Sequence, residues 1–139
     1  MIEKKLLQPN RVRHIEGGFS FIPHRFLADG FLASLTQKEI LLYLFLVLAS
    51  DRYGLPFYAY DAICSLLQIT LDEYIEARDS LIRKDLIAFD GTLFQVLDLP
   101  ESPVPTPPTK AALASDRPQH RYQIATRIQQ SLWEAEGDR

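Results

Sequence analysis

The sequence predicts a mainly α-helical fold with one small β-hairpin, an α+β class, and three observations carry this prediction. Residues 36–39 and 70–73 both match the capping box, in which a Thr hydroxyl and a Glu carboxylate each accept a backbone N–H at the start of a helix. The Asp-Gly pair at 90–91 separates two apolar, β-prone runs, which is the strongest short signal for a hairpin. Five prolines among residues 100–109 then interrupt the chain before helical periodicity returns.

The central part of the chain divides into helices, one extended segment and two strands. In chain order, we predict helices over 26–35 and 36–50, an extended segment over 56–59, helices over 60–67 and 71–84, and strands over 86–89 and 92–96. Gly30 weakens the first helix. The second helix carries ten consecutive apolar residues over 40–49, so we expect it to be covered on several sides, either by the N-terminal helix and the C-terminal segment or by a second protomer. Asp90 and Gly91 are predicted to form the two-residue turn of the hairpin.

Composition divides the chain into four parts: a basic N-terminal arm (1–20), a central domain (21–99), a proline-rich linker (100–118) and a C-terminal helix (119–139). The first 30 residues hold five basic against three acidic residues, a net charge of +2, and the next 70 hold five against ten, a net charge of -5. The remainder is neutral, which gives the overall -3. The central domain is therefore acidic, and the arm that precedes it is basic.

Composition and motifs exclude several classes of protein. The single cysteine excludes a disulfide framework and a cysteine-rich zinc site, and it fits a reducing compartment. The longest apolar run has ten residues, whereas a membrane span needs about 20, so we expect a soluble, cytoplasmic protein with no membrane contact. The sequence contains no GxSxG, Gly-rich phosphate loop, HExxH or CxxC motif, so we expect no enzyme, no cofactor and no metal site.

Apolar and capping residues of the central domain follow a known order. They are Phe21–Pro23, Leu35, Thr36 and 39–43 upstream, then Ile63, Leu66 and Leu67, then Ile69 and Thr70, then Ala77 and Leu81, and finally Leu86 and Ile87. This pattern resembles the winged helix-turn-helix domain over residues 21–98, in particular that of plasmid and phage replication initiators and replisome-loading proteins. The chain departs from the family at Gln68, where the turn usually has Gly, and at Asp85 before the wing. Asp85 is the better tolerated, because Asp adopts left-handed backbone more easily than most residues.

The resemblance implies duplex DNA as the ligand, with the second helix of the motif in the major groove. On a helical wheel of residues 71–84, one arc is apolar and is predicted to be buried, and it holds Leu71, Tyr74, Ile75, Ala77, Leu81 and Ile82. The opposite arc is predicted to face solvent with a net charge of -2, and it holds Asp72, Glu76, Asp79 and Arg83. Phosphate contacts supply much of the affinity for DNA, and this acidic arc would repel phosphates. We therefore expect this helix to read little of the base sequence directly.

Two functions remain open. The first is a non-catalytic, dimeric accessory or regulatory protein associated with double-stranded DNA, whose phosphate contacts come from Lys4, Lys5, Arg11, Arg13, Arg83 and Lys84. The alternative is a protein-interaction adaptor whose acidic helix docks a basic partner through Asp72, Glu76 and Asp79. In either case the C-terminal helix packs on its own domain, or forms a homodimer or partner contact, through Ile128, Leu132 and Trp133.

Arg78 lies near the middle of the predicted apolar arc, where a charge must be paired or must reach the surface. Two arrangements are open. Either its aliphatic stem packs in the core with the guanidinium at the edge, or it forms a buried ion pair with Asp61 or Glu39. In the second case Arg78 fixes the packing of the helix-turn-helix motif.

Overall fold

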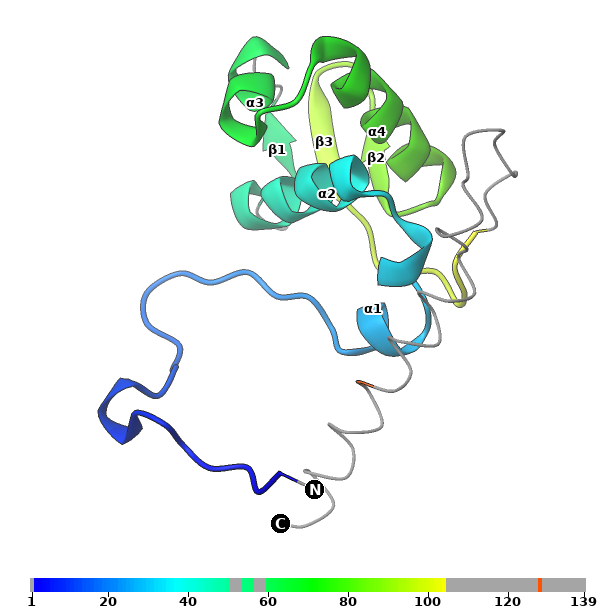
Figure 1. The fold of residues 1–139 in the computed structure, drawn as a ribbon. Coiled ribbons are helices and arrows are strands. Elements are labelled where there is room, and N and C mark those ends of the chain that lie inside the picture. The colour runs from blue at the N-terminus through cyan, green and yellow to red at the C-terminus, as the bar shows by residue number, and fades with distance from the viewer. Residues whose placement is uncertain (1, 51–53, 57–59, 105–127, 129–139) are drawn as a thin grey trace.

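The computed structural model describes residues 2–50, 54–56, 60–104 and 128 of the 139-residue chain (Figure 1). The described elements are η1 (Pro9–Arg11), α1 (Arg25–Ala28), η2 (Leu32–Ser34), α2 (Gln37–Ala49), β1 (Leu55–Pro56), α3 (Tyr60–Leu67), α4 (Leu71–Arg83), β2 (Ile87–Phe89) and β3 (Leu93–Val96), where η marks a 3-10 helix. The predicted mainly helical α+β class is therefore confirmed. Within the described ranges, no helix is both long enough and apolar enough to cross a membrane.

α4 begins at a complete capping box, as predicted. Thr70 Oγ1 accepts the Glu73 N–H at 3.1 Å, and the Thr70 N–H donates to Glu73 Oε1 at 2.9 Å. α2 has only half of the predicted box, because the Glu39 N–H donates to Thr36 Oγ1 at 3.3 Å but the Glu39 carboxylate accepts the Thr36 hydroxyl, at 2.7 Å, instead of a backbone N–H. The other oxygen of this carboxylate accepts from the Lys84 ammonium, which draws Glu39 into the protein.

The helix predicted over 26–35 is two short pieces, α1 and η2. Gly30 lies between them with φ +89°, a left-handed conformation in which a right-handed helix cannot continue. The Asp29 N–H donates to the Arg25 carbonyl at 2.8 Å and closes α1 just before this glycine. The prediction of one continuous helix is therefore wrong, because Gly30 ends the helix instead of only weakening it.

The three strands form one antiparallel sheet in the order β1–β3–β2. Phe89 of β2 pairs with Phe94 of β3, and the two rings stack with their centroids 4.2 Å apart. On the other edge of β3, Leu55 of β1 pairs with Phe94. Phe94 is completely buried, so the central strand carries the apolar centre of the sheet.

The hairpin turn lies one residue later than predicted. The Asp90 N–H donates to the Leu93 carbonyl at 3.3 Å, so Gly91 and Thr92, and not Asp90 and Gly91, are the two central residues. Gly91 has φ +99°, a value that suits the first central position of such a turn. Asp90 caps the turn instead, because its Oδ1 accepts the N–H groups of Thr92 and Leu93, both at 2.8 Å. These hydrogen bonds lower the pKa of Asp90.

The core lies between the sheet and the helices α2 and α4 (Figure 1). α2 packs against α4 and β3, and α4 packs against α3 and β2. The Phe26 ring stacks on Tyr43 with the centroids 5.1 Å apart and extends the core to α1. This packing fixes α4, because one side of the helix is held by α2, α3 and β2.

α2 buries only part of its apolar surface within the described residues. Leu42 and Leu46 are completely buried, whereas Leu41 and Leu44 are exposed and Leu48 is 66% exposed. The expectation that this helix is covered on several sides is therefore not met by the described part of the chain. The N-terminal helix and the C-terminal segment, or a second protomer, were the predicted cover. α1 contacts α2 through Phe26 and Tyr43, and the C-terminal segment lies outside the described residues apart from the exposed Ile128.

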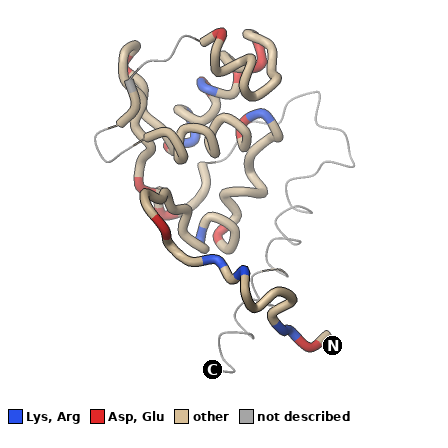
Figure 2. Tube along the Cα trace, turned by 90° about the vertical axis from the view of Figure 1, so that its left-hand side faces the viewer, with Lys and Arg blue, Asp and Glu red and all other residues tan. Residues whose placement is uncertain are grey.

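Both ends of the central domain lie at α1. The exposed segment extends two residues beyond the predicted arm (1–20), so residues 2–22 are called the arm from here on. The arm leaves the domain at α1, with η1 as its one regular element (Figures 1 and 2). The segment after β3 returns to the same place, since the Arg25 guanidinium donates to the carbonyls of Leu99 at 3.1 Å and Pro100 at 2.6 Å. The predicted linker and C-terminal helix lie outside the described residues, apart from residues 100–104 and Ile128.

Candidate interaction surfaces

The turn between α3 and α4 fixes where α4 begins. Gln68 adopts a left-handed φ of +58°, and the Ile69 N–H donates to the Cys64 carbonyl at 3.0 Å, the long bond of a Schellman motif. The Ile69 side chain is buried in the core directly after this turn. Backbone hydrogen bonding and burial together set the direction in which α4 leaves α3.

α4 ends in the same kind of motif. Asp85 adopts a left-handed φ of +62°, the Leu86 N–H donates to the Leu81 carbonyl, and the Asp85 N–H donates to the Ile82 carbonyl, both at 3.1 Å. Leu86 is buried and leads directly into β2. Both ends of α4 are thus held, so the side chains on its outer surface have fixed positions.

α4 turns a different arc toward the core than the helical wheel predicted. Tyr74, Ala77 and Leu81 are buried as predicted. The other three side chains that were predicted to be buried are exposed: Leu71 at 44%, Ile75 at 36% and Ile82 at 37%. Ser80 and Lys84 are buried. α2 packs against this side of α4, and two ion pairs join the two helices there: Lys38 Nζ lies 3.3 Å from Glu73 Oε2, and Lys84 Nζ binds the Glu39 carboxylate.

Leu71, Ile75 and Ile82 form an apolar row along the outside of α4. The four charged residues that were predicted to face solvent lie beside it and form an acidic row. Asp72, Glu76 and Arg83 are exposed, and Asp79 is half-buried and accepts from Arg78 Nε at 3.2 Å. We call these two rows together the α4 face, which consists of Leu71, Asp72, Ile75, Glu76, Asp79, Ile82 and Arg83. Its net charge of -2 and its apolar row both suit phosphate oxygens and base edges poorly.

Arg78 packs on aromatic rings and does not pair with Asp61 or Glu39. Its guanidinium carbon lies 5.6 Å from the Tyr74 ring centroid and 5.5 Å from that of Phe89, within cation–π range. The side chain is 25% exposed, so the stem lies in the core and the guanidinium at its edge. The first of the two predicted arrangements is therefore correct, and the buried ion pair with Asp61 or Glu39 is wrong.

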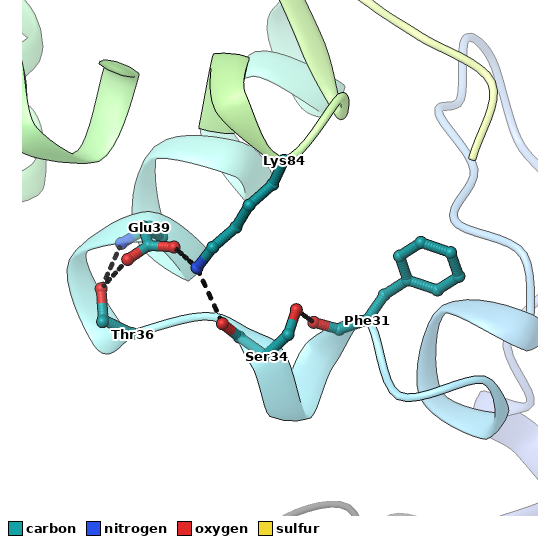
Figure 3. Close-up of polar contacts among 5 residues, drawn as sticks. All are labelled: Phe31, Ser34, Thr36, Glu39 and Lys84. Carbon is teal, nitrogen blue, oxygen red and sulfur yellow. Dashed lines mark hydrogen bonds and ion pairs between the residues drawn. The ribbon is translucent and has the colours of Figure 1, made fainter. Parts of the chain in front are cut away.

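Lys84 lies inside the domain, away from any surface that could meet DNA (Figure 3). Its ammonium donates to the Glu39 carboxylate and, at 2.8 Å, to the Ser34 carbonyl. The Thr36 hydroxyl donates to the other carboxylate oxygen of Glu39, and the Ser34 hydroxyl donates to the Phe31 carbonyl at 2.6 Å. The prediction that Lys84 contacts phosphate is wrong, because its charge is buried and neutralised in a network that joins η2, α2 and α4.

The other residues predicted to contact phosphate lie in solvent, four on the arm and one in the last turn of α4 (Figure 2). They are Lys4, Lys5, Arg11, Arg13 and Arg83. The arm also has two acidic residues, Glu3 and Glu16, so four basic residues against two acidic ones give it a net charge of +2. Phe21 and Ile22, which belong to the pattern that resembles the winged helix, are exposed on the arm. The arm also exposes apolar residues that the sequence analysis did not single out, and they are Ile2, Leu6, Leu7, Val12, Ile15 and Phe19.

The remaining predicted site residues belong to the C-terminal segment. Ile128 is exposed, whereas Leu132 and Trp133 lie outside the described residues. Within the ranges that the structure describes, no group of three or more His, Cys, Asp or Glu side chains is placed to hold a metal ion. Among the described residues, the basic arm and the α4 face combine charge with exposed apolar side chains, whereas the exposed leucines of α2 form a purely apolar surface.

No protein-family model, curated protein or solved structure matches this chain. Function is therefore inferred from the charge, burial and placement of the arm and the α4 face.

Proposed function

We propose that the chain is a non-catalytic winged-helix protein that associates with DNA as an accessory or regulatory factor in transcription, replication or a mobile element. Two features support the domain type. The elements follow the order α2, β1, α3, α4, β2, β3 with the sheet order β1–β3–β2, and a short turn at Gln68 joins α3 to α4. In this interpretation α3 and α4 form the helix-turn-helix, and the β2–β3 hairpin is the wing.

In this proposal the arm makes the DNA contacts. The observation that supports this assignment is that the arm and the α4 face have opposite net charges. The arm has a net charge of +2 and is exposed along its length, whereas the α4 face has a net charge of -2. Phosphates repel an acidic helix, while an extended basic segment can follow a groove or the backbone. DNA binding should therefore be sensitive to salt and depend little on sequence.

Fluorescence anisotropy of a labelled random-sequence duplex at about 50 and about 200 mM salt tests this function. A variant with Gln at Lys4, Lys5, Arg11 and Arg13 removes four arm cations, so the slope of log K against log salt should become shallower by about 3–4. Arg83→Gln is the matched control on α4, and it should change the slope by less than about 1. Absence of binding at the lower salt, or an unchanged slope in the fourfold variant, would contradict the proposal.

The exposed apolar row of α4 favours a second function, that of a protein-interaction adaptor. Acidic and apolar side chains lie next to each other on the α4 face, a combination that suits a basic amphipathic partner better than DNA. Reversing Asp72 and Glu76 to Lys separates the two functions. The change should strengthen DNA binding if the face lies near phosphates, and it should abolish capture of a basic amphipathic peptide if the face is a docking surface.

A further inference from the structure

We propose that the α4 face of one copy binds the N-terminal arm of a second copy, which gives an arm-exchanged homodimer. Both surfaces are exposed in the described structure. The arm is apolar and basic, and the α4 face is apolar and acidic. The dimer itself does not depend on DNA binding, but its effect on DNA binding rests on the proposed function.

The arm has more exposed apolar surface than phosphate contacts can use. Leu7, Ile15 and Phe19 are 85%, 71% and 66% exposed, and further large apolar side chains lie between and beside them. DNA phosphates attract the cations of the arm but do not cover such side chains. Clusters of exposed apolar residues mark contacts with protein, so the arm needs a protein surface with an apolar part.

The α4 face offers the complementary chemistry. Its apolar row, Leu71, Ile75 and Ile82, extends over about 16 Å of helix at about 1.5 Å per residue, which about five extended residues cover. Residues 4–7 of the arm read Lys-Lys-Leu-Leu, so two cations are followed directly by two leucines. Side chains alternate along an extended segment, so Lys4 and Leu6 share one side and Lys5 and Leu7 the other. Laid along α4, either side presents one lysine and one leucine to the adjacent acidic and apolar rows, and the net charges of +2 and -2 are opposite.

The occupant is a second copy because of the direction in which the arm leaves its own domain. The arm extends from the α1 end, while α3 and the start of α4 lie at the other end of the domain, and only the C-terminal end of α4 approaches η2 through Lys84 (Figure 1). An arm that points away from its own α4 can meet the α4 of a neighbour. Exchange of two arms about a two-fold axis forms the contact twice and closes the assembly at a dimer.

In the proposed dimer, the α4 face of one copy and DNA compete for the arm of the other copy. The same arm cations bind either phosphates or the acidic row of the partner's α4, and they cannot do both at once. Duplex DNA should therefore release the arm and shift the protein toward the monomer. Arm exchange would keep the arm covered when no DNA is bound.

Sedimentation equilibrium of the full chain at low salt, without DNA, tests the exchange. The natural sequence should show a concentration-dependent monomer–dimer equilibrium. The face variant Leu71→Ser/Ile75→Ser and the arm variant Leu6→Ser/Leu7→Ser should each raise the dimer dissociation constant by more than about tenfold. All four positions are exposed, so circular dichroism should show both variants folded.

Mixing the two variants separates arm exchange from a merely structural effect. The face variant retains its arm and the arm variant retains its α4 face, so the mixture restores one of the two contacts and should form heterodimers. The matched control is Leu44→Ser/Leu48→Ser, which removes two exposed leucines from α2 and should leave the dimer intact. A monomer at every concentration, or a dimer that is lost in the α2 control and retained in the face variant, would overturn the inference.

Anisotropy with the same random-sequence duplex tests the competition. The face variant should bind DNA severalfold more tightly than the natural sequence, because it releases the arm without adding positive charge, and an unchanged affinity would overturn the competition. If the dimer forms as described and no variant binds DNA, arm exchange stands and the DNA function fails. If the arm binds DNA and the chain stays monomeric, the DNA function stands and arm exchange fails.

Discussion

At the scale of single residues, the strongest constraint is the ion pair between Lys84 and Glu39. Both side chains are nearly fully buried, and they also bind the Ser34 carbonyl and the Thr36 hydroxyl. Removing one partner leaves the other charge buried without compensation, so we expect Lys84→Met and Glu39→Gln each to lower the free energy of unfolding by about 3–5 kcal/mol. Urea denaturation of the double variant completes the cycle, and it should lose clearly less than the sum. Additive losses would show that the two charges do not interact.

Glu73 makes the stability of the domain depend on pH. The Thr70 N–H donates to its carboxylate and lowers its pKa from the ordinary 4.5, and the Thr70 hydroxyl and Lys38 act in the same direction. Because the folded pKa lies below the unfolded one, the contribution is fully present above about pH 4.5 and is lost as the pH falls through the folded value.

A substitution at Glu73 checks this dependence, because Gln keeps a capping side chain but does not titrate. Glu73→Gln should flatten the fall in the free energy of unfolding below about pH 4.5, measured by urea denaturation at several pH values. Asp72→Asn is the matched control, since it removes a carboxylate from the same helical turn and leaves the cap in place. An acid fall as steep in Glu73→Gln as in the natural sequence would contradict this role.

At the scale of elements, α2 is the helix whose placement the sequence leaves undetermined. The run over 40–49 is apolar on every side, so its pattern does not indicate which side faces the core. The structure buries Leu46 completely and leaves Leu48 66% exposed. We therefore expect Leu46→Ala to lower the free energy of unfolding by about 2–5 kcal/mol and Leu48→Ala by less than about 1 kcal/mol. Equal losses in thermal or urea unfolding would mean that the helix is rotated.

Local signals predicted where the helices start, and tertiary contacts determined which way they face. Thr70 begins α4 as predicted because a capping box is complete within four residues. The rotation of α4 was not predictable from its apolar pattern, which favours the arc of Leu71, Ile75 and Ile82, whereas α2 contacts the helix through Lys84 and Glu73. The small residues Ala77 and Ser80 were a usable signal, since a neighbouring helix approaches closely where side chains are short.

The candidate site was predictable in its charge and not in its apolar part. The sequence identified the basic arm and the acidic row of α4, because charge can be counted without a fold. The wheel placed Ile75 and Ile82 in the core, since it assigns the most apolar arc to the inside. Lys84 was predicted to contact DNA because a lysine is expected on the protein surface unless a buried partner is known. Its partner Glu39 lies 45 positions away in the sequence, so the pair is not visible in the local pattern.

At the scale of the whole molecule, Arg25 joins the two ends of the domain. Its guanidinium binds the carbonyls of Leu99 and Pro100 and lies 5.3 Å from the Phe31 ring centroid, so it connects α1 with the chain that follows the sheet. The arm and the segment after β3 therefore leave the domain at one end, while α3 and the start of α4 lie at the other (Figure 1). In the proposed arm exchange, this separation directs an arm toward the α4 of another copy.

We expect Arg25→Gln to lower the free energy of unfolding by about 1–2 kcal/mol, because two carbonyls lose a charged donor that is only partly screened by solvent. In urea the midpoint should fall while the slope m stays the same, since the surface exposed on unfolding does not change. Arg11→Gln on the exposed arm is the control and should not shift the midpoint when protein concentration is low enough to keep the chain monomeric. If Arg25→Gln left the midpoint unchanged, the hydrogen bonds to Leu99 and Pro100 would not be what holds the two ends together. The common exit of the arm and the segment after β3 would then depend on apolar packing, which includes Leu99 against the core and the aromatic rings around Phe31.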